Sequence, residues 1–240
     1  MRIKILTLFK KQIEDFLKHS IIAKAIDEQK ISIEVIDIRA YSDHKHKKVD
    51  DKPYGGGAGM LMQYDVLHKA LSAHKGKAYT IITSPAGKLF KQAKAKKLSK
   101  KDELLIICGH YEGYDHRIIE DIDEEISIGN YVLTGGELAA LAIVDATIRL
   151  SKGVINDQSL KDESFNNNLL EYPQYTRPYS YNNRSVPKVL LSGNHELIRR
   201  YRLKEALKRT YYNKRSLIKK EKLTKEMQEL LAEIIKESKC

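Results

Sequence analysis

The sequence predicts an α/β protein with a mostly parallel sheet and helices on its faces. Segments rich in branched apolar residues alternate with helix-like segments through the first half of the chain, which is the pattern of repeated βαβ units. The chain has 240 residues and 42% apolar content, which is enough for a substantial core. We expect strands at 3–9, 31–38, 78–83 and 103–108, and helices at 12–19, 63–73 and 89–98.

The segment 125–137 joins a strand end, a turn and a helix start. Gly129-Asn130 is a turn signal, and Thr134 stands three residues before Glu137, which is the spacing of a helix capping box. A long apolar helix is expected to follow at 135–150. Such strand-to-helix junctions bind ligands in open α/β proteins, although an ordinary connection has the same pattern.

The chain changes character after this helix. Residues 151–168 are polar and predict a flexible linker at a domain boundary, and helices are expected beyond it at 196–210 and 224–237. Between residues 184 and 222 there are 13 Lys or Arg against 3 Glu, interleaved with three tyrosines. This pattern suits RNA, with cations for phosphates and rings for unpaired bases, but a solvated helix face is the alternative. The tyrosines are Tyr201, Tyr211 and Tyr212.

Charge and cysteine content narrow the class of protein. A formal net charge of +11 favours a polyanionic partner, and the absence of a long uncharged apolar run favours nucleic acid over a membrane. The two cysteines, Cys108 and Cys240, support neither a disulfide framework nor a zinc site, and the eight histidines have no metal-ligand spacing. We therefore expect a cytoplasmic protein without a metal.

Several short motifs have both a functional and a purely structural interpretation. The glycine cluster at 55–60 lacks the Lys-Ser/Thr of a P-loop, so a mobile surface loop is the preferred interpretation. The sequence SPAG at 84–87 predicts a tight turn after a strand. Glu112 either accepts a hydrogen bond from a ligand or caps the next helix. Arg149 complements the dipole at its helix end.

Five of these segments, in this order, closely resemble the bacterial tRNA (guanine-N1)-methyltransferase family. They are GGGAGM at 55–60, SPAG at 84–87, CGHYEG at 108–113, SIGNYVLTGGELAA at 127–140 and LLSGNH at 190–195. Members of this family methylate guanosine 37 of tRNA, beside the anticodon, with S-adenosylmethionine as methyl donor. The resemblance covers nearly the whole chain.

The resemblance implies a fold that the periodicity does not predict. It implies a SPOUT-type α/β domain with a C-terminal trefoil knot at 1–155, a flexible linker at 156–170 and a small, basic helical tRNA-binding domain at 171–240. It also implies an obligate homodimer that binds the tRNA anticodon stem-loop, with each active site shared between subunits. General rules of chain topology disfavour a knot.

The resemblance also assigns the cofactor pocket. Backbone groups of three loops would hold the adenosine and methionine moieties, glycines would allow close approach, and apolar side chains would form walls. The glycine cluster at 55–60 would then contact the guanine. The residues implied for the cofactor are Pro85, Gly109, Tyr111, Glu112, Ile128, Gly129, Asn130, Tyr131, Val132, Leu133, Gly135 and Gly136.

Catalysis on guanine N1 needs a base for the N1 proton and a cation near O6. Arg149 matches the family arginine near O6. The family typically has Asp-Ser-Phe in the linker, whereas this chain has Glu163-Ser164-Phe165, preceded by Asp162. Glu163 is our expected base, because it aligns with the family aspartate and has a similar intrinsic pKa. Asp162 is the alternative. A non-catalytic RNA-binding protein, or a SPOUT enzyme for another RNA, is the competing hypothesis.

Overall fold

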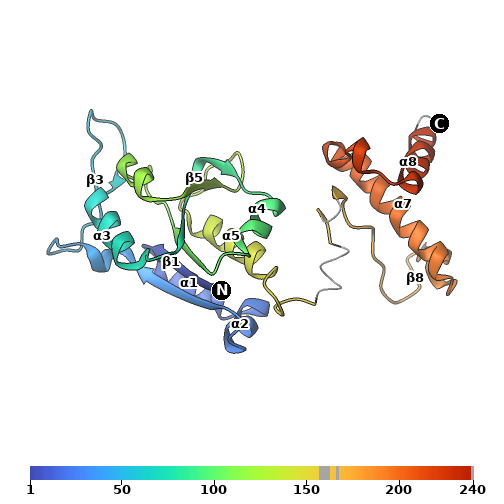
Figure 1. The fold of residues 1–240 in the computed structure, drawn as a ribbon, viewed down its shortest axis with the longest axis horizontal. Helices are drawn as coiled ribbons and strands as arrows, with labels where there is room; N and C mark the ends of the chain where they lie inside the picture. Colours follow the sequence, from blue (N-terminus) through green and yellow to red (C-terminus); the bar gives the residue numbers. More distant parts are fainter. Residues whose placement is uncertain (157–162, 166–167, 239–240) are drawn as a thin grey trace. The chain divides into compact units, whose positions relative to one another are not determined.

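The computed structural model of the chain describes residues 1–156, 163–165 and 168–238. The chain forms two compact units, Met1–Ile155 and Asn156–Cys240, each with an apolar core of its own (Figure 1). Among the described residues, no helix is both long enough and apolar enough to cross a membrane.

A five-stranded sheet forms the centre of the first unit. Its strand order is β2-β1-β6-β5-β7, and all four neighbouring pairs are parallel. This arrangement confirms the predicted α/β class with a parallel sheet. Because the strands are parallel, their carboxyl ends lie at one edge of the sheet. The strands are β1 (Arg2–Thr7), β2 (Ser32–Asp37), β5 (Tyr79–Leu89), β6 (Glu103–Ile107) and β7 (Glu124–Ser127).

Alternating apolar side chains cover both faces of this sheet. Leu104 and Ile106 of β6 pack with one set of helices, and Leu105 and Ile107 pack with the other. All four side chains are fully buried. The first face is covered by α1 (Lys10–Leu17), α2 (Ser20–Asp27), α4 (Gln92–Leu98) and α5 (Glu137–Ile148), and the second by α3 (Tyr64–His74) and the 3-10 helices η1 (Ile38–Tyr41) and η2 (His116–Asp121) (Figure 1).

The expected turn at 84–87 interrupts strand β5 instead of ending it. Thr83 and Lys88 both lie opposite Ile126 of β7, so the four residues between them bulge out of the ladder. Beyond the bulge, Leu89 pairs with Ser127, and Phe90 N donates a hydrogen bond to Ser127 O at 2.7 Å. Helix α4 therefore begins at Gln92 and not at the predicted residue 89.

The second unit has a much smaller core. Helices α7 (His195–Asn213) and α8 (Lys225–Glu237) pack together, and both have side-chain N-caps, from Asn194 and Thr224. Ion pairs join the two helices along their exposed sides, among them Arg199–Glu226 at 2.6 Å. The buried apolar residues of this core are Leu169, Ala206, Leu207, Leu230 and Ile234.

Short elements complete both units. They are β3 (Asp50–Asp51) and β4 (Leu61–Met62), which form a small antiparallel ladder in the first unit, and β8 (Ser180–Tyr181), β9 (Arg184–Ser185), η4 (Lys188–Leu191), η5 (Arg215–Leu217) and η6 (Lys220–Lys222) in the second.

Candidate functional site

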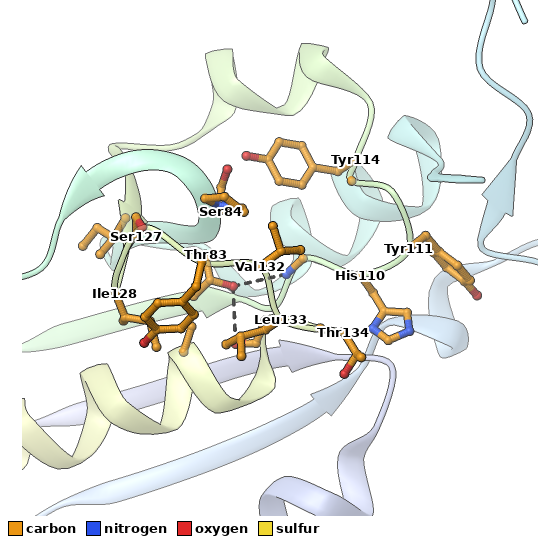
Figure 2. Close-up of a pocket in the computed structure, with 18 of the residues that line it drawn as sticks. Thr83, Ser84, His110, Tyr111, Tyr114, Ser127, Ile128, Val132, Leu133 and Thr134 are labelled. Carbon is orange, nitrogen blue, oxygen red and sulfur yellow. Dashed lines mark hydrogen bonds between the residues drawn. The ribbon is translucent and has the colours of Figure 1, made fainter. Parts of the chain in front are cut away.

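A cavity of about 340 Å³ lies at the carboxyl ends of β5, β6 and β7 (Figure 2). Three segments that follow or interrupt these strands form its walls: 83–85, 109–114, and 126–136 without Asn130. The position matches the general rule that open parallel sheets bind ligands beyond the carboxyl ends of their strands.

Thr83 joins the three segments at the base of the cavity. Its hydroxyl donates to Ile107 O at 3.3 Å and lies 3.4 Å from Gly136 O, while Gly109 N donates to the hydroxyl oxygen at 3.3 Å (Figure 2). Gly136 N donates to Gly109 O at 2.6 Å. A Cβ on residue 136 would overlap the Thr83 hydroxyl and lie 2.6 Å from Gly109 N. Glycine is therefore required at 136 by the close approach of protein backbone.

Helix α5 starts differently from the prediction. Its N-cap is Gly136, and no side chain caps it, so the expected capping box of Thr134 and Glu137 is absent. The Glu137 side chain is buried, and its Oε1 accepts a hydrogen bond from Thr7 Oγ1 at 2.8 Å. Glu137 accepts a hydrogen bond from the distant Thr7 and does not form a local cap, because a buried carboxylate must be hydrogen bonded.

His110 stands beside this buried carboxylate. Its Nδ1 lies 3.9 Å from Glu137 Oε2 and, among the described residues, is one of three buried side-chain polar atoms without a hydrogen bond. The ring packs on Phe9, with 4.8 Å between centroids, and on Tyr111, with 5.0 Å. His110 lines the cavity, while its Nδ1 is buried on the side of Glu137. Nearby, burial and the Glu137 charge raise the pKa of the Cys108 thiol well above its usual value, so this thiol is neutral.

Tyr114 lines another part of the cavity. Its hydroxyl donates to a Glu125 carboxylate oxygen on β7, and burial together with this hydrogen bond raises the pKa of Tyr114. The bond ties the loop after β6 to the strand that carries the next wall. Sequence analysis missed Tyr114, because nothing in the local pattern indicates a partner eleven residues away.

The glycine cluster at 55–60 is exposed and connected to the cavity loop. Glu112 N donates to Met60 O at 3.1 Å, and Met62 N donates to Gly113 O at 3.0 Å. A Cβ on Gly59 would overlap the Glu112 side chain, so these two segments are in close contact. Glu112 does not cap the next helix, because Asp115 does so by accepting from Arg117 N at 3.0 Å.

The structure brings together most of the residues that the sequence analysis assigned to the cofactor. Asn130 is the exception and is absent from the cavity lining. Their role in binding remains a prediction. The assigned residues that line the cavity are Pro85, Gly109, Tyr111, Glu112, Ile128, Gly129, Tyr131, Val132, Leu133, Gly135 and Gly136, and those the sequence analysis missed are Thr83, Ser84, His110, Gly113, Tyr114, Ile126, Ser127, Thr134 and Ala139.

The catalytic candidates are divided between the two units of the chain. Arg149 is the C-cap residue of α5 in the first unit. Glu163 is half-buried in the second unit, and Asp162 lies outside the described residues. No cluster of three or more His, Cys, Asp or Glu suited to a metal occurs within the described part of the chain.

These features define a class of protein: a parallel α/β protein with a ligand-sized cavity built from the loops of three adjacent strands. The family model described as tRNA (Guanine-1)-methyltransferase TrmD matches residues 1–220, and the chain belongs to this family.

Curated relatives match over nearly their whole length. A tRNA (guanine-N(1)-)-methyltransferase of Fusobacterium nucleatum is 53% identical over 238 residues, covering 99% of both chains. Proteins with the same name from Dictyoglomus turgidum and Lacticaseibacillus paracasei are 49% and 48% identical, covering 99% and 98% of this chain and 98% and 93% of their own. The family resemblance found in the five motifs is thereby confirmed.

Proposed function

We propose that this chain transfers a methyl group from S-adenosylmethionine to N1 of guanosine 37 in tRNA. The main support is full-length similarity to proteins named tRNA (guanine-N(1)-)-methyltransferase. A ligand-sized cavity at the strand ends supports the small-molecule half of the proposal. The basic second unit supports the RNA half.

The cavity residues fit the proposed cofactor. S-adenosylmethionine, when bound, supplies a methyl group on a positively charged sulfur. Ile128 and Leu133 offer apolar walls to an adenine ring, and the backbone at 109–113 and 129–136 offers donors and acceptors.

The proposed chemistry replaces the N1–H bond of guanine with an N1–CH3 bond. Guanine N1 is a poor nucleophile while it carries its proton, so a base must take that proton as the methyl group arrives. We assign this role to the Glu163 carboxylate. The Arg149 guanidinium would donate to guanine O6 and offset the negative charge that builds there.

We further infer a SPOUT-type knot and a homodimer. The close packing of Gly136 against Thr83 and Gly109, at the ends of two earlier strands, is consistent with a chain that passes through a loop. In the dimer, the partner subunit's Glu163 would act together with Arg149 of the subunit that supplies the cavity. Mixing Arg149→Ala dimers with Glu163→Gln dimers should then restore activity, because one site of each mixed dimer has both wild-type residues. No recovery after confirmed subunit exchange would contradict a shared site.

Methyl transfer to tRNA transcripts tests the substrate. We expect transfer to a transcript with guanosine at positions 36 and 37, and none to a transcript that lacks guanosine 37. The modified position is read by mass spectrometry of nuclease fragments. Equal labelling of both transcripts would refute the assignment of the target base.

Substitution of the proposed base is our first prediction for the mechanism. Glu163→Gln keeps the side-chain shape but cannot take a proton, so single-turnover methyl transfer should fall by about 100-fold or more. Binding of S-adenosylhomocysteine, measured by calorimetry, should be unchanged. Glu229→Gln, at an exposed position on α8, is the matched control and should retain full activity. A normal rate for Glu163→Gln with a slow rate for Asp162→Asn would transfer the role to Asp162.

A further inference from the structure

The second unit contains a groove of about 620 Å³ that no part of the proposed chemistry uses. It lies between the chain at 172–179 and the segment that runs from η4 into α7. Its volume lies within the range of small-molecule sites in proteins. All of its lining residues belong to the second unit, so the groove exists independently of how the two units are arranged.

Tyrosine rings are the main feature of the lining. Tyr175 and Tyr179 are each 47% exposed, although tyrosine usually buries its ring. Tyr172 is half-buried, and the Arg202 guanidinium lies over its ring at 4.9 Å from the centroid. Apolar side chains of Leu190 and Leu191 complete the surface. Flat rings and a stacked guanidinium are the groups on which proteins stack unpaired bases.

The charge of the groove is positive. Its lining includes Arg177 and Arg202 and contains no Asp or Glu. Among the described residues, no carboxylate lies within ion-pair distance of either arginine, whereas Arg199 and Lys204 on the same helix as Arg202 are paired with glutamates of α8. The structure therefore neutralises the arginines and lysines between its helices but leaves the cations of the groove available to an anion.

We propose that this groove binds an unpaired nucleotide of the RNA substrate other than the methylated guanosine. The base would stack on the exposed ring of Tyr179, and its phosphate would lie against Arg202 or Arg177. This inference rests on the proposed function for the identity of the RNA. It adds a second contact between protein and substrate, separate from the methyl-transfer site and located in side chains of the second unit.

Replacement of the stacking ring tests the groove. Tyr179→Leu should weaken binding of a tRNA transcript by about 5- to 100-fold, the usual range for loss of one stacked base. Tyr179→Phe keeps the ring and should bind within about twofold of wild type. Tyr181→Leu is the matched control, because Tyr181 is 71% exposed two residues away and outside the groove lining. Affinity is read by fluorescence anisotropy at fixed salt.

The salt dependence of tRNA binding tests the role of Arg202. Arg202→Gln should reduce the slope of log affinity against log salt by a little under one, as expected for loss of one phosphate contact. Thermal unfolding and binding of S-adenosylhomocysteine should be unchanged in all variants that support the proposal. These two measurements separate a lost RNA contact from a damaged fold.

Two outcomes would overturn the groove as an RNA site. One is equal loss of tRNA affinity in Tyr179→Leu and Tyr181→Leu. The other is unaltered RNA binding in Tyr179→Leu together with a changed sedimentation coefficient, which would assign the groove to a protein surface. If the wild-type enzyme methylates tRNA and Tyr179→Leu binds tRNA normally, only the groove inference fails. If the wild type binds tRNA through Tyr179 but does not methylate it, only the proposed function fails.

Discussion

The two candidate binding sites are built by opposite means. The cavity of the first unit is held by backbone contacts among three strand ends, with Thr83, Gly109 and Gly136 in direct contact. The groove of the second unit is formed by tyrosine and arginine side chains on a small helical core. The difference indicates that the two sites suit different kinds of ligand. If both proposals hold, preorganised backbone would bind a small ligand of fixed shape, whereas side chains that can adapt would bind a large and variable polyanion.

The two cores differ in the same way. Two apolar clusters cover both faces of the parallel sheet in the first unit, whereas one cluster of five buried residues lies between helices in the second. Small cores leave little margin of stability. The second unit also contains a side-chain cap from Asn194 and ion pairs from Arg199 to glutamates.

The largest loss of ligand binding is expected when a side-chain methyl group is added at residue 136, where two backbone segments are in close contact. Gly136→Ala would force the Gly109 and Thr83 segments apart, and we expect binding of S-adenosylhomocysteine to weaken by about 100-fold or more by calorimetry. Gly76→Ala provides a contrast, because residue 76 has open space around it and a φ of +48°. Backbone strain at residue 76 should lower stability but leave binding of S-adenosylhomocysteine unchanged. Near-normal binding in Gly136→Ala would show that the cavity adapts, which would remove the contrast between the sites.

Large-to-small substitutions in the two apolar cores should lower the stability of separate units. Leu207→Ala should destabilise the second unit by about 2–5 kcal/mol and leave binding of S-adenosylhomocysteine intact. Leu104→Ala removes an equally buried side chain from the sheet and should destabilise the first unit instead. Differential scanning calorimetry distinguishes the two. One transition lowered to the same extent by both variants would mean that the units unfold together.

A smaller effect is expected from the hydrogen bond beneath the cavity. Thr7→Val removes the donor to the buried Glu137 carboxylate and should lower the free energy of unfolding of the first unit by about 1–3 kcal/mol. Thr7→Ser retains the hydroxyl and should recover most of this loss. Urea denaturation measures both. Equal stability of the valine variant and the wild type would mean that Glu137 finds another partner.

The smallest effect should come from the exposed ion pairs of the second unit. Arg199 lowers the pKa of Glu226, so this contribution is present above the ordinary glutamate pKa of about 4.3 and is lost as pH falls through the lower, folded-state pKa. Glu226→Gln should make the melting temperature of the second unit depend less on pH in the acidic range. Glu229→Gln, on the exposed face of the same helix, should leave it unchanged. Identical pH profiles for both variants would contradict a role for the Arg199 pair.

Periodicity predicted most of the long helices and sheet strands, but it missed α2 and did not predict the contacts between elements. Branched apolar runs located β1 and β6 to within two residues because buried parallel strands need them. The same local reasoning ended β5 at residue 83, since pairing of Leu89 with Ser127 depends on a strand far along the chain. It also assigned Glu137 to a local cap, although its partner, Thr7, is 130 residues away.

The same difference between local patterns and long-range contacts decides which site residues could be predicted. Local patterns marked a strand-to-helix junction at 125–137, because turns and strand ends have local signatures. The family resemblance assigned residues of this junction to the cofactor. His110 and Tyr114 were missed because their place in the lining depends on Glu137 and Glu125, which belong to other elements. The family resemblance supplied the chemistry that local patterns left open.

The bond between Thr7 and Glu137 also constrains the order of events during protein synthesis. Strand β1 is made first, but its neighbour β6 and the carboxylate partner of Thr7 are made more than 90 residues later. Loop closure over such distances is slow. A nascent chain that has not yet released α5 from the ribosome lacks one wall of the cavity. Ligand binding therefore cannot guide the early folding of this unit.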